Sequence, residues 1–419
     1  MAKTTPLRER ANAEVFQRLV DSEPVLIDIV PAGDALGGMT RQTILASGPT
    51  MPWRDYIGGQ RDAIIGGALF EGLARDRAEA EDRLDRGAIA VKGCHEFGAV
   101  GSVAGIYTAS MPVFVVRNTR YGNIGYCNFY EGTNPRRLNY GVYDDGVKER
   151  LDYVHKVIAP VITAAVRRSG GIALKPIMQR ALHMGDELHS RNTAASLLFA
   201  RELFPHLIEV ATGNKDGVLK TIDALTADNY FFLRLSMAAA KAVADAAHGV
   251  VGASVVSAMT LGCRAFAIRV SGLGDRWFGG PHPQVQAKLF DGHSEDEISW
   301  MGGESIIAET VGLGGFAQAG APALQLYQGG SVEAMIERNL ELYGITVGEN
   351  PNYKIPYLGY RGTPTGIDIF KVVDTGVTPA MDVGIAGRDG GQIGAGVVRA
   401  AADCFHLAAE AYRAQYGTE

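Results

Sequence analysis

The segment 269–278 combines residue types that suit the binding of a small anion. Its members are Arg269, Ser271, Gly272, Gly274, Asp275, Arg276, Trp277 and Phe278. An apolar run over residues 265–270 predicts a short buried strand that ends in a glycine turn. Glycines let backbone N–H groups approach a ligand, and arginine presents a planar fork of donors to carboxylate or phosphate. The segment therefore predicts an anion site at a strand end.

A candidate acid–base group lies in the segment 185–192. Asp186, His189 and Asn192 are spaced three residues apart, which would place them near one face of a helix. Asp186 could then orient the His189 imidazole, which would act as acid or base. Alternatively, Asp186 caps a helix and His189 is polar surface. The residue types leave both interpretations open.

Two further charged residues stand in apolar surroundings. Lys241 and Asp245 are four residues apart in an alanine-rich segment, the spacing of an ordinary helical ion pair. A buried helix would make the lysine costly and would favour a functional role. Glu309 lies among apolar residues and glycines, where its pKa would rise and it could act as a general base. A salt bridge to an arginine is the alternative for Glu309.

Two glycine-containing segments near the C-terminus also suit anions. Arg361, Thr363 and Thr365 could clamp phosphate or carboxylate, with a rigid turn as the alternative. Residues 390–396, which include Gln392 and Gly394, predict a glycine loop that leads into a helix over 397–412, with an anion at its N-terminus. The sequence lacks the GxxxxGK[ST] pattern and the strand and acid of a dinucleotide site, so no nucleotide cofactor is predicted.

The run Cys94-His95-Glu96 suggests a metal pair or a nucleophile, but neighbouring side chains of a strand point in opposite directions. No HExxH pattern is present, so we predict no metal site. Contact of His95 or Glu96 with substrate remains a hypothesis.

Composition sets the class of protein. The chain has 419 residues, a net charge of −6 and 47% hydrophobic residues, which predicts a globular protein with more than one domain and argues against nucleic acid or an anionic membrane as partner. No apolar run is long enough for a membrane span or a signal peptide, and the four cysteines are widely spaced. We expect a cytoplasmic protein with reduced thiols and, from base rates, a homodimer.

The predicted fold class is α/β (mixed α+β), multidomain with a central helical subdomain. We predict an N-terminal α/β domain over 1–145, a helical subdomain over 146–228 and a glycine-rich α/β domain over 229–419 that carries most of the site. Residues 121–143 are expected to form a loop, and strands are expected over 25–30 and 111–116. The apolar periodicity predicts helices over 11–20, 55–73, 75–86, 147–168, 174–183, 193–203, 219–224, 231–248, 306–319 and 331–342.

The chain resembles the YlbE-like family in the order of its polar and glycine-containing segments. This family includes the large subunit of oxamate carbamoyltransferase of allantoin breakdown. The resemblance runs from about Val15 to Phe405 and implies a multidomain α/β protein with a helical insert. Phe97, Tyr230 and the loop at Asp389 depart from the expected pattern. The resemblance rests on residues 111–113, 185–192, 231–241, 269–278, 309–317, 361–368 and 391–396.

The resemblance implies transfer of a carbamoyl group between carbamoyl phosphate and the amide nitrogen of oxamate, giving oxalurate. Phosphate would cleave oxalurate in the catabolic direction. A partner similar to a succinyl-CoA synthetase subunit is implied as well. Arg269, Arg276 and Arg361 would bind the phosphate and the oxyanion, and His189 or Glu309 would be the base. The alternatives are a hydrolase of a ureide, cyclic imide or related compound, and a non-catalytic subunit that binds a small anion.

Overall fold

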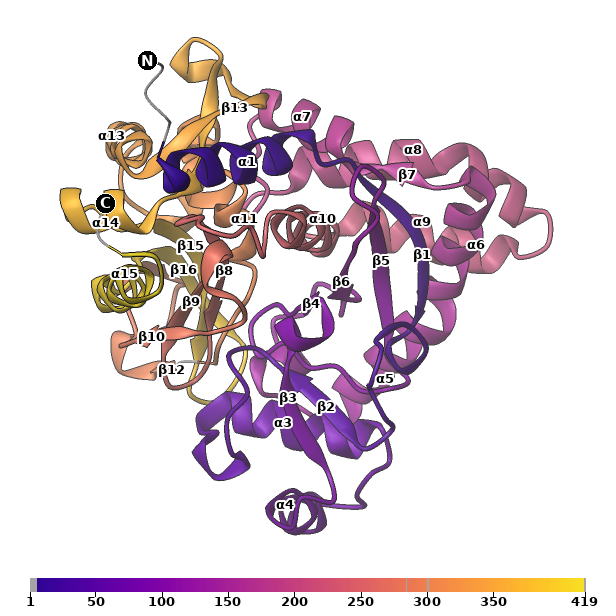
Figure 1. The fold of residues 1–419 in the computed structure, drawn as a ribbon. Helices are drawn as coiled ribbons and strands as arrows, with labels where there is room; N and C mark the ends of the chain where they lie inside the picture. The colour runs from indigo at the N-terminus through magenta and orange to yellow at the C-terminus, as the bar shows by residue number, and fades with distance from the viewer. Residues whose placement is uncertain (1–5, 284, 300, 418–419) are drawn as a thin grey trace.

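The computed structural model describes residues 6–283, 285–299 and 301–417. Within these ranges the chain forms several small sheets, most of them antiparallel, together with a block of helices (Figure 1). This arrangement confirms the predicted multidomain α/β fold. In the described ranges, no helix combines the length and the apolar character that crossing a membrane requires.

The largest sheet lies on one side of the molecule and has the strand order β4-β6-β5-β1-β7. Its core strand β5 reads Val113-Phe114-Val115-Val116 and is buried on both faces, because helices cover the sheet. β5 pairs in antiparallel register with both β1 and β6. The strands are β1 (Pro24–Pro31), β4 (Ala99–Val100), β5 (Pro112–Asn118), β6 (Ile124–Asn128) and β7 (Ile172–Ala173).

Helices α3 and α4 and strands β2 and β3 lie at the bottom of Figure 1, helix α1 lies at the top, and α2 packs against β1 and β5. Strands β2 and β3 pair in parallel, and α3 packs beside β2. The elements are α1 (Leu7–Asp21), α2 (Ala32–Ala35), β2 (Thr43–Ala46), α3 (Gly58–Phe70), α4 (Arg77–Asp85) and β3 (Ala90–Gly93).

A block of helices follows, as predicted, and extends from α7 at the top of Figure 1 down its right side to α5. A π-helical turn over Val154–Ile158 joins α5 to α6, and helix α7 has the predicted bounds. Asp144 and Asn214 cap the starts of α5 and α9. The helices are α5 (Asp145–Tyr153), α6 (Ala159–Ser169), α7 (Leu174–His183), α8 (Thr193–Ala211) and α9 (Lys215–Ala227).

Helix α10 (Leu233–Ala246) crosses the middle of the molecule (Figure 1). It is buried at every position except Leu233 and Asp245, and it packs on β5 and β6. Its alanines leave room for the strands to approach closely, so the helix carries Arg234 and Lys241 into the interior.

The approach of β6 to α10 depends on Gly125. A Cβ at this position would collide with the backbone of α10 at Ala238 and Ala242. We expect Gly125→Ala to lower the free energy of unfolding by about 1–3 kcal/mol, the cost of forcing an extra group into a packed core. Urea unfolding measures the change. Gly344→Ala is the matched control, because a Cβ there meets nothing within 4 Å; equal effects of the two variants would contradict the prediction.

The C-terminal part contains three further sheets, at the left of Figure 1. Their orders are β10-β9-β8, β11-β16-β15-β12 and β13-β14. The strands are β8 (Val256–Leu261), β9 (Phe266–Val270), β10 (Phe278–Gly280), β11 (Val285–Leu289), β12 (Ile298–Ser299), β13 (Thr346–Ile355), β14 (Arg361–Ile367), β15 (Ala380–Gly387) and β16 (Gln392–Arg399). The helices are α11 (Ile307–Thr310), α12 (Gln325–Gln328), α13 (Val332–Leu342), α14 (Ile369–Thr375) and α15 (Ala402–Tyr416).

Three local predictions are wrong. Residues 397–412 were expected to be one helix, but β16 forms a hairpin with β15 and helix α15 begins only at Ala402. Glycines and the pair Val397-Val398 disfavour a helix there. The segment 306–319 forms short helical turns in place of one helix, since its glycines interrupt it. The expected loop over 121–143 contains strand β6.

Apolar packing crosses the predicted domain boundaries. The largest cluster of buried apolar side chains combines β1 and β5, the helical block, α10 and α11. A second cluster lies between the C-terminal sheets and α15. The division at residues 145 and 228 stays a prediction.

Candidate functional site

A cavity of about 80 Å³ lies where the helical block, α10 and the C-terminal sheets meet. One water needs about 10–15 Å³ on this measure, so the cavity has room for a polar ligand of several atoms. Most of the residues that line it are polar or charged. The lining residues are Ser102, Val103, Tyr130, Glu131, Arg137, Tyr140, His189, Ser190, Asp228, Tyr230, Leu233, Arg234, Ser305, Tyr327, Gly384 and Gln392.

Two arginines supply positive charge to this cavity. Arg234 lies in the first turn of α10 and is 7% exposed, and its Nη1 has no hydrogen-bond partner. Arg137 is half-buried and lies over the Tyr140 ring; its Nη2 donates to Gln392 Oε1 at 3.4 Å, and its Nε has no partner. Buried donors without a partner cost free energy, so a carboxylate or phosphate in the cavity would stabilise both side chains.

Tyrosine hydroxyls and an amide surround the arginines. Gln392 at the start of β16 donates from Nε2 to the hydroxyl of Tyr327 and to the carbonyl of Gly394 at 3.2 Å. Burial raises the pKa of Tyr327, and burial with the neighbouring Tyr327 raises the pKa of Tyr230. Both phenols therefore keep their protons near neutral pH and can donate to an anion.

His189 enters the cavity from the loop between α7 and α8. Its Nδ1 lies 2.8 Å from Oε1 of Glu309, which reaches it from α11. Burial alone would lower the pKa of His189, but the charge and hydrogen bond of Glu309 outweigh it and the pKa is raised. Because Glu309 occupies Nδ1, Nε2 is the ring nitrogen left to face a ligand.

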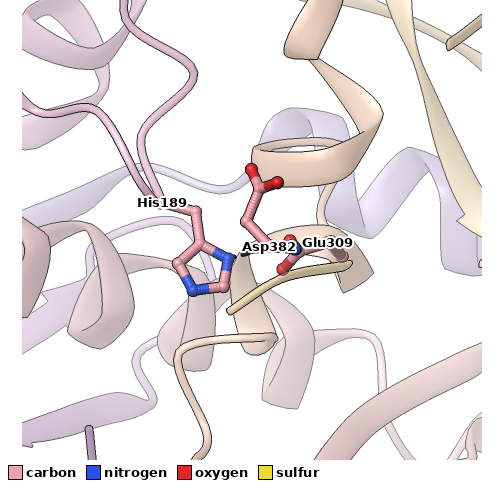
Figure 2. A group of neighbouring side chains, drawn as sticks. All are labelled: His189, Glu309 and Asp382. Carbon is pink, nitrogen blue, oxygen red and sulfur yellow. Dashed lines mark hydrogen bonds and ion pairs between the residues drawn. The ribbon is translucent and has the colours of Figure 1, made fainter. Parts of the chain in front are cut away.

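Asp382, on β15, is the third member of this group, and Figure 2 draws it beside His189 and Glu309. One ligand atom from each of the three residues lies within 4.8 Å of the others. Burial raises the pKa of Asp382 to about 6. Burial, followed by the charge of Asp382, raises the pKa of Glu187 well above its usual value. Three buried carboxylates thus crowd one imidazole.

The predicted role of Asp186 needs a correction. Residues 184–192 form a loop, and α8 begins only at Thr193, so the expected helical face does not exist. Asp186 Oδ2 accepts from Ala195 N at 2.8 Å and lies at the start of α8, as in the capping alternative. Burial raises its pKa to about 6. Glu309 is the partner of the His189 ring, and Asn192 Nδ2 donates to the His189 carbonyl at 2.8 Å.

Lys241, His95 and Arg269 belong to a second polar cluster. Lys241 is 1% exposed; its Nζ lies 3.1 Å from His95 Nδ1 and 2.7 Å from Asp245 Oδ1. The Arg269 guanidinium stacks on Trp277 at 4.4 Å, and the His95 ring meets the same indole edge-on. Burial, followed by the charge of Lys241, lowers the pKa of His95 well below its usual value. The sequence favoured a functional role for Lys241 only if its helix is buried, and the helix is buried.

Glu304 lies beside this second cluster, with its Oε1 3.9 Å from His95 Nε2. It is fully buried and accepts from Gly48 N, Gly101 N and Thr260 Oγ1, while its neighbour Ser305 lines the cavity. Burial raises the pKa of Glu304 to about 7.

This raised pKa predicts a pH-dependent stability. Between about pH 4.5 and 7 the folded chain keeps the Glu304 proton while the unfolded chain has released it, so stability falls as the pH rises through this window, by about 3 kcal/mol in total. Glu304→Gln should flatten that fall, which urea unfolding at pH 5 and pH 8 measures. The exposed Glu410→Gln serves as control. An unchanged pH dependence in Glu304→Gln would contradict the prediction.

Other residues of the segment 269–278 lie away from the cavity walls. Ser271 Oγ donates to the Ala247 carbonyl at 2.6 Å, next to the end of α10. Gly272 N donates to the Ala253 carbonyl at 3.0 Å, in the loop between α10 and β8. Gly274 is exposed with φ +65°. The Asp275 side chain is 88% exposed and lies 3.6 Å from Arg269 Nη1.

The structure does not bring Arg276 or Arg361 to His189. Arg276 is exposed, lies over the Phe278 ring and lines a surface hollow beside α15. Arg361 is exposed and pairs with Glu349 at 2.6 Å, whereas Thr363 and Thr365 are buried and contact each other.

Of three further predicted residues, one lines the cavity and two do not. Gln392 lines the cavity, but Gly394 lies inside β16, paired with Leu289 and Ile385. Glu96 is exposed and accepts from the Thr50 hydroxyl.

Four residues of the site were not among those predicted from the sequence: Arg137, Arg234, Glu187 and Asp382. Asp382 left a usable signal, since it is the lone charged residue in an otherwise apolar strand segment, residues 380–387. Arg234 had a weaker one, at the start of an alanine-rich helix. Arg137, in a loop of mixed composition, had none.

The fold and site define a mixed α/β protein with a buried, arginine-lined cavity. The family described as oxamate carbamoyltransferase subunit AllG matches residues 89–305. Two proteins of Escherichia coli (strain K12) are each 38% identical to this chain: oxamate carbamoyltransferase subunit AllG, over 97% of this chain and 98% of its own length, and the uncharacterized protein YahG, over 99% and 88%. The chain belongs to the AllG family of oxamate carbamoyltransferase subunits.

A solved structure shows the same fold. It is a conserved protein of unknown function from Enterococcus faecalis V583, with a TM-score of 0.95 at 36% identity, covering 98% of this chain and 99% of that one. The comparisons thus confirm the predicted relation to an oxamate carbamoyltransferase, under the name AllG.

Proposed function

We propose that this chain takes part in carbamoyl transfer between carbamoyl phosphate and a small amide such as oxamate, and that the reaction occurs in the cavity at His189. The observation that carries the proposal is the pair Arg137 and Arg234, whose buried donors lack partners in a cavity of small-molecule size. Both substrates are small anions, so two arginine forks fit them. Family membership supports the same reaction.

We describe the reaction in the catabolic direction, with a role for each of these residues. A phosphate oxygen attacks the carbamoyl carbon of oxalurate, and the bond from that carbon to the amide nitrogen breaks. The nitrogen takes up the proton that the attacking hydrogen phosphate loses and leaves as oxamate. We assign the deeper Arg234 to the oxalurate carboxylate and Arg137 to phosphate. Negative charge develops on the carbamoyl oxygen, where the Nε2–H of His189 and the tyrosine hydroxyls would stabilise it.

We further propose that the chain works as a cytoplasmic subunit with a succinyl-CoA-synthetase-like partner and pairs with a second copy of itself. The Escherichia coli relative is itself named as a subunit, which supports a multisubunit assembly. The equal identity to AllG and YahG means that oxamate is one of several amides worth testing.

The test uses the purified chain with oxalurate and phosphate. Carbamoyl phosphate is detected through carbamate kinase and ADP as ATP. Phosphate-dependent ATP formation would support the proposal. Oxalurate loss without phosphate would favour the hydrolase alternative. If activity appears only after addition of the partner subunits, its loss in His189→Gln would support the proposal, and full activity of that variant would favour the non-catalytic alternative.

A further inference from the structure

The Glu309 carboxylate next to His189 has an uneven set of contacts. Its Oε1 accepts from His189 Nδ1 at 2.8 Å, from Gly315 N at 3.0 Å and from Asp382 N at 3.0 Å. Its Oε2 is buried and has no partner. One oxygen is therefore saturated and fixed by the protein, while the second is bare.

Asp382 repeats this pattern. Its Oδ1 accepts from the amide of Gln318 and from that of Gln328 at 2.9 Å, and its Oδ2 is buried without a partner. The amides are themselves held, because Arg338 Nη1 donates to Gln318 Oε1 at 2.6 Å. Each of the two carboxylates thus has one buried oxygen without a partner, and one oxygen of each lies within 4.8 Å of a His189 ring nitrogen. Hydrogen bonds that orient the ligand side chains in this way are typical of metal sites.

The charges of these buried residues also indicate a place for a cation. Glu187, Glu309 and Asp382 are each 0% exposed, and Glu187 accepts from the backbone N–H groups of His189 and Arg191. Buried charges are normally paired or coordinate a metal, because an unpaired buried charge is costly. Among the described residues, Glu309 pairs with the His189 imidazole at 2.8 Å, and no ion pair reaches Asp382 or Glu187. One imidazole therefore faces three buried carboxylates, and a cation between Glu309 and Asp382 would lower the cost of burying them.

We propose that His189, Glu309 and Asp382 bind a divalent cation of the zinc or manganese type. One nitrogen and two carboxylate oxygens are suitable ligands for these ions. All three ligand atoms lie within 4.8 Å of one another, so small side-chain shifts complete the site.

The site goes beyond the proposed reaction and does not depend on it. With the cation bound to Nδ1, the Nε2–H of His189 can still donate to a ligand in the cavity. The ion would then add positive charge on the side of the imidazole that faces away from the substrate. The ligands come from segments 120 and 73 residues apart, which is why no short sequence motif revealed them.

The test is direct metal binding to the full chain without substrate. Chelator-treated protein is titrated with Zn²⁺ and with Mn²⁺ by calorimetry, and bound metal is counted by elemental analysis. We expect about one equivalent per chain, weaker binding of Mg²⁺, and at least about 10–100-fold weaker Zn²⁺ binding in Glu309→Gln and Asp382→Asn. A Zn²⁺-soaked crystal should show an anomalous peak at His189.

Glu297→Gln is the matched control, because Glu297 and His293 form an exposed pair at 2.8 Å that resembles the proposed ligands. It should leave the tight equivalent unchanged. No tight equivalent in the wild type, or binding by both ligand variants as in the wild type, would overturn the proposal. If a variant fails to fold, the wild-type stoichiometry and the anomalous peak still decide. Metal binding without carbamoyl transfer would refute only the proposed function.

Discussion

Replacing His189 by glutamine is expected to lower kcat for carbamoyl transfer by about 10²–10³-fold, the loss that follows removal of one donor to a developing oxyanion. His189 lines the cavity, and Glu309 holds Nδ1 so that Nε2 faces the ligand. Glutamine cannot make both contacts at once. Steady-state rates with oxalurate and phosphate, with the partner subunits present if they are required, measure the effect.

The loss should appear mainly in kcat, because the arginines that bind the substrate are unchanged. His406→Gln, an exposed histidine on α15, is the control and should keep wild-type rates. A His189→Gln enzyme that folds and retains more than about a third of the wild-type kcat would remove His189 from the reaction.

Arg234→Gln is expected to lower kcat/KM for oxalurate by about 10–100-fold. The guanidinium is buried and its Nη1 is free, so it can form a charge-assisted bond with the substrate carboxylate, worth about 1.5–3 kcal/mol. Arg234→Lys should recover part of the loss, because it keeps the charge without the planar fork. Substrate titrations of the two variants and the wild type measure the difference.

The substrate itself provides a sharper control. Acetylurea has the carbamoyl-amide unit without the carboxylate, so Arg234→Gln and the wild type should cleave it at the same low rate. Arg201→Gln, an exposed arginine on α8, should behave as the wild type with both compounds. Equal losses on oxalurate and acetylurea would show that Arg234 supports the fold and not carboxylate binding.

The sequence by itself determined most of the helices and the identity of several polar residues that matter. Apolar periodicity is a local property, and it fixed α7 to the residue. Glu309 and Lys241 stood out because a polar group in an apolar segment needs a partner wherever it is buried. His189 was selected for its spacing from Asp186 and Asn192, although the helical face that this spacing assumed does not form. The glycines of residues 390–396 suggested a loop followed by a helix, but residues 392–399 form strand β16, because they pair with β15.

Only the tertiary structure decided which polar residues share a site. His189 and Glu309 are 120 residues apart, and Asp382 is a further 73 residues along the chain, so no spacing rule could join them. The chain crossings that bring α10, α11 and β15 together also left Arg276 and Arg361 at the surface and placed Arg234 in the cavity. Residue type shows that a buried charge needs a partner, but which partner it meets depends on packing between distant segments.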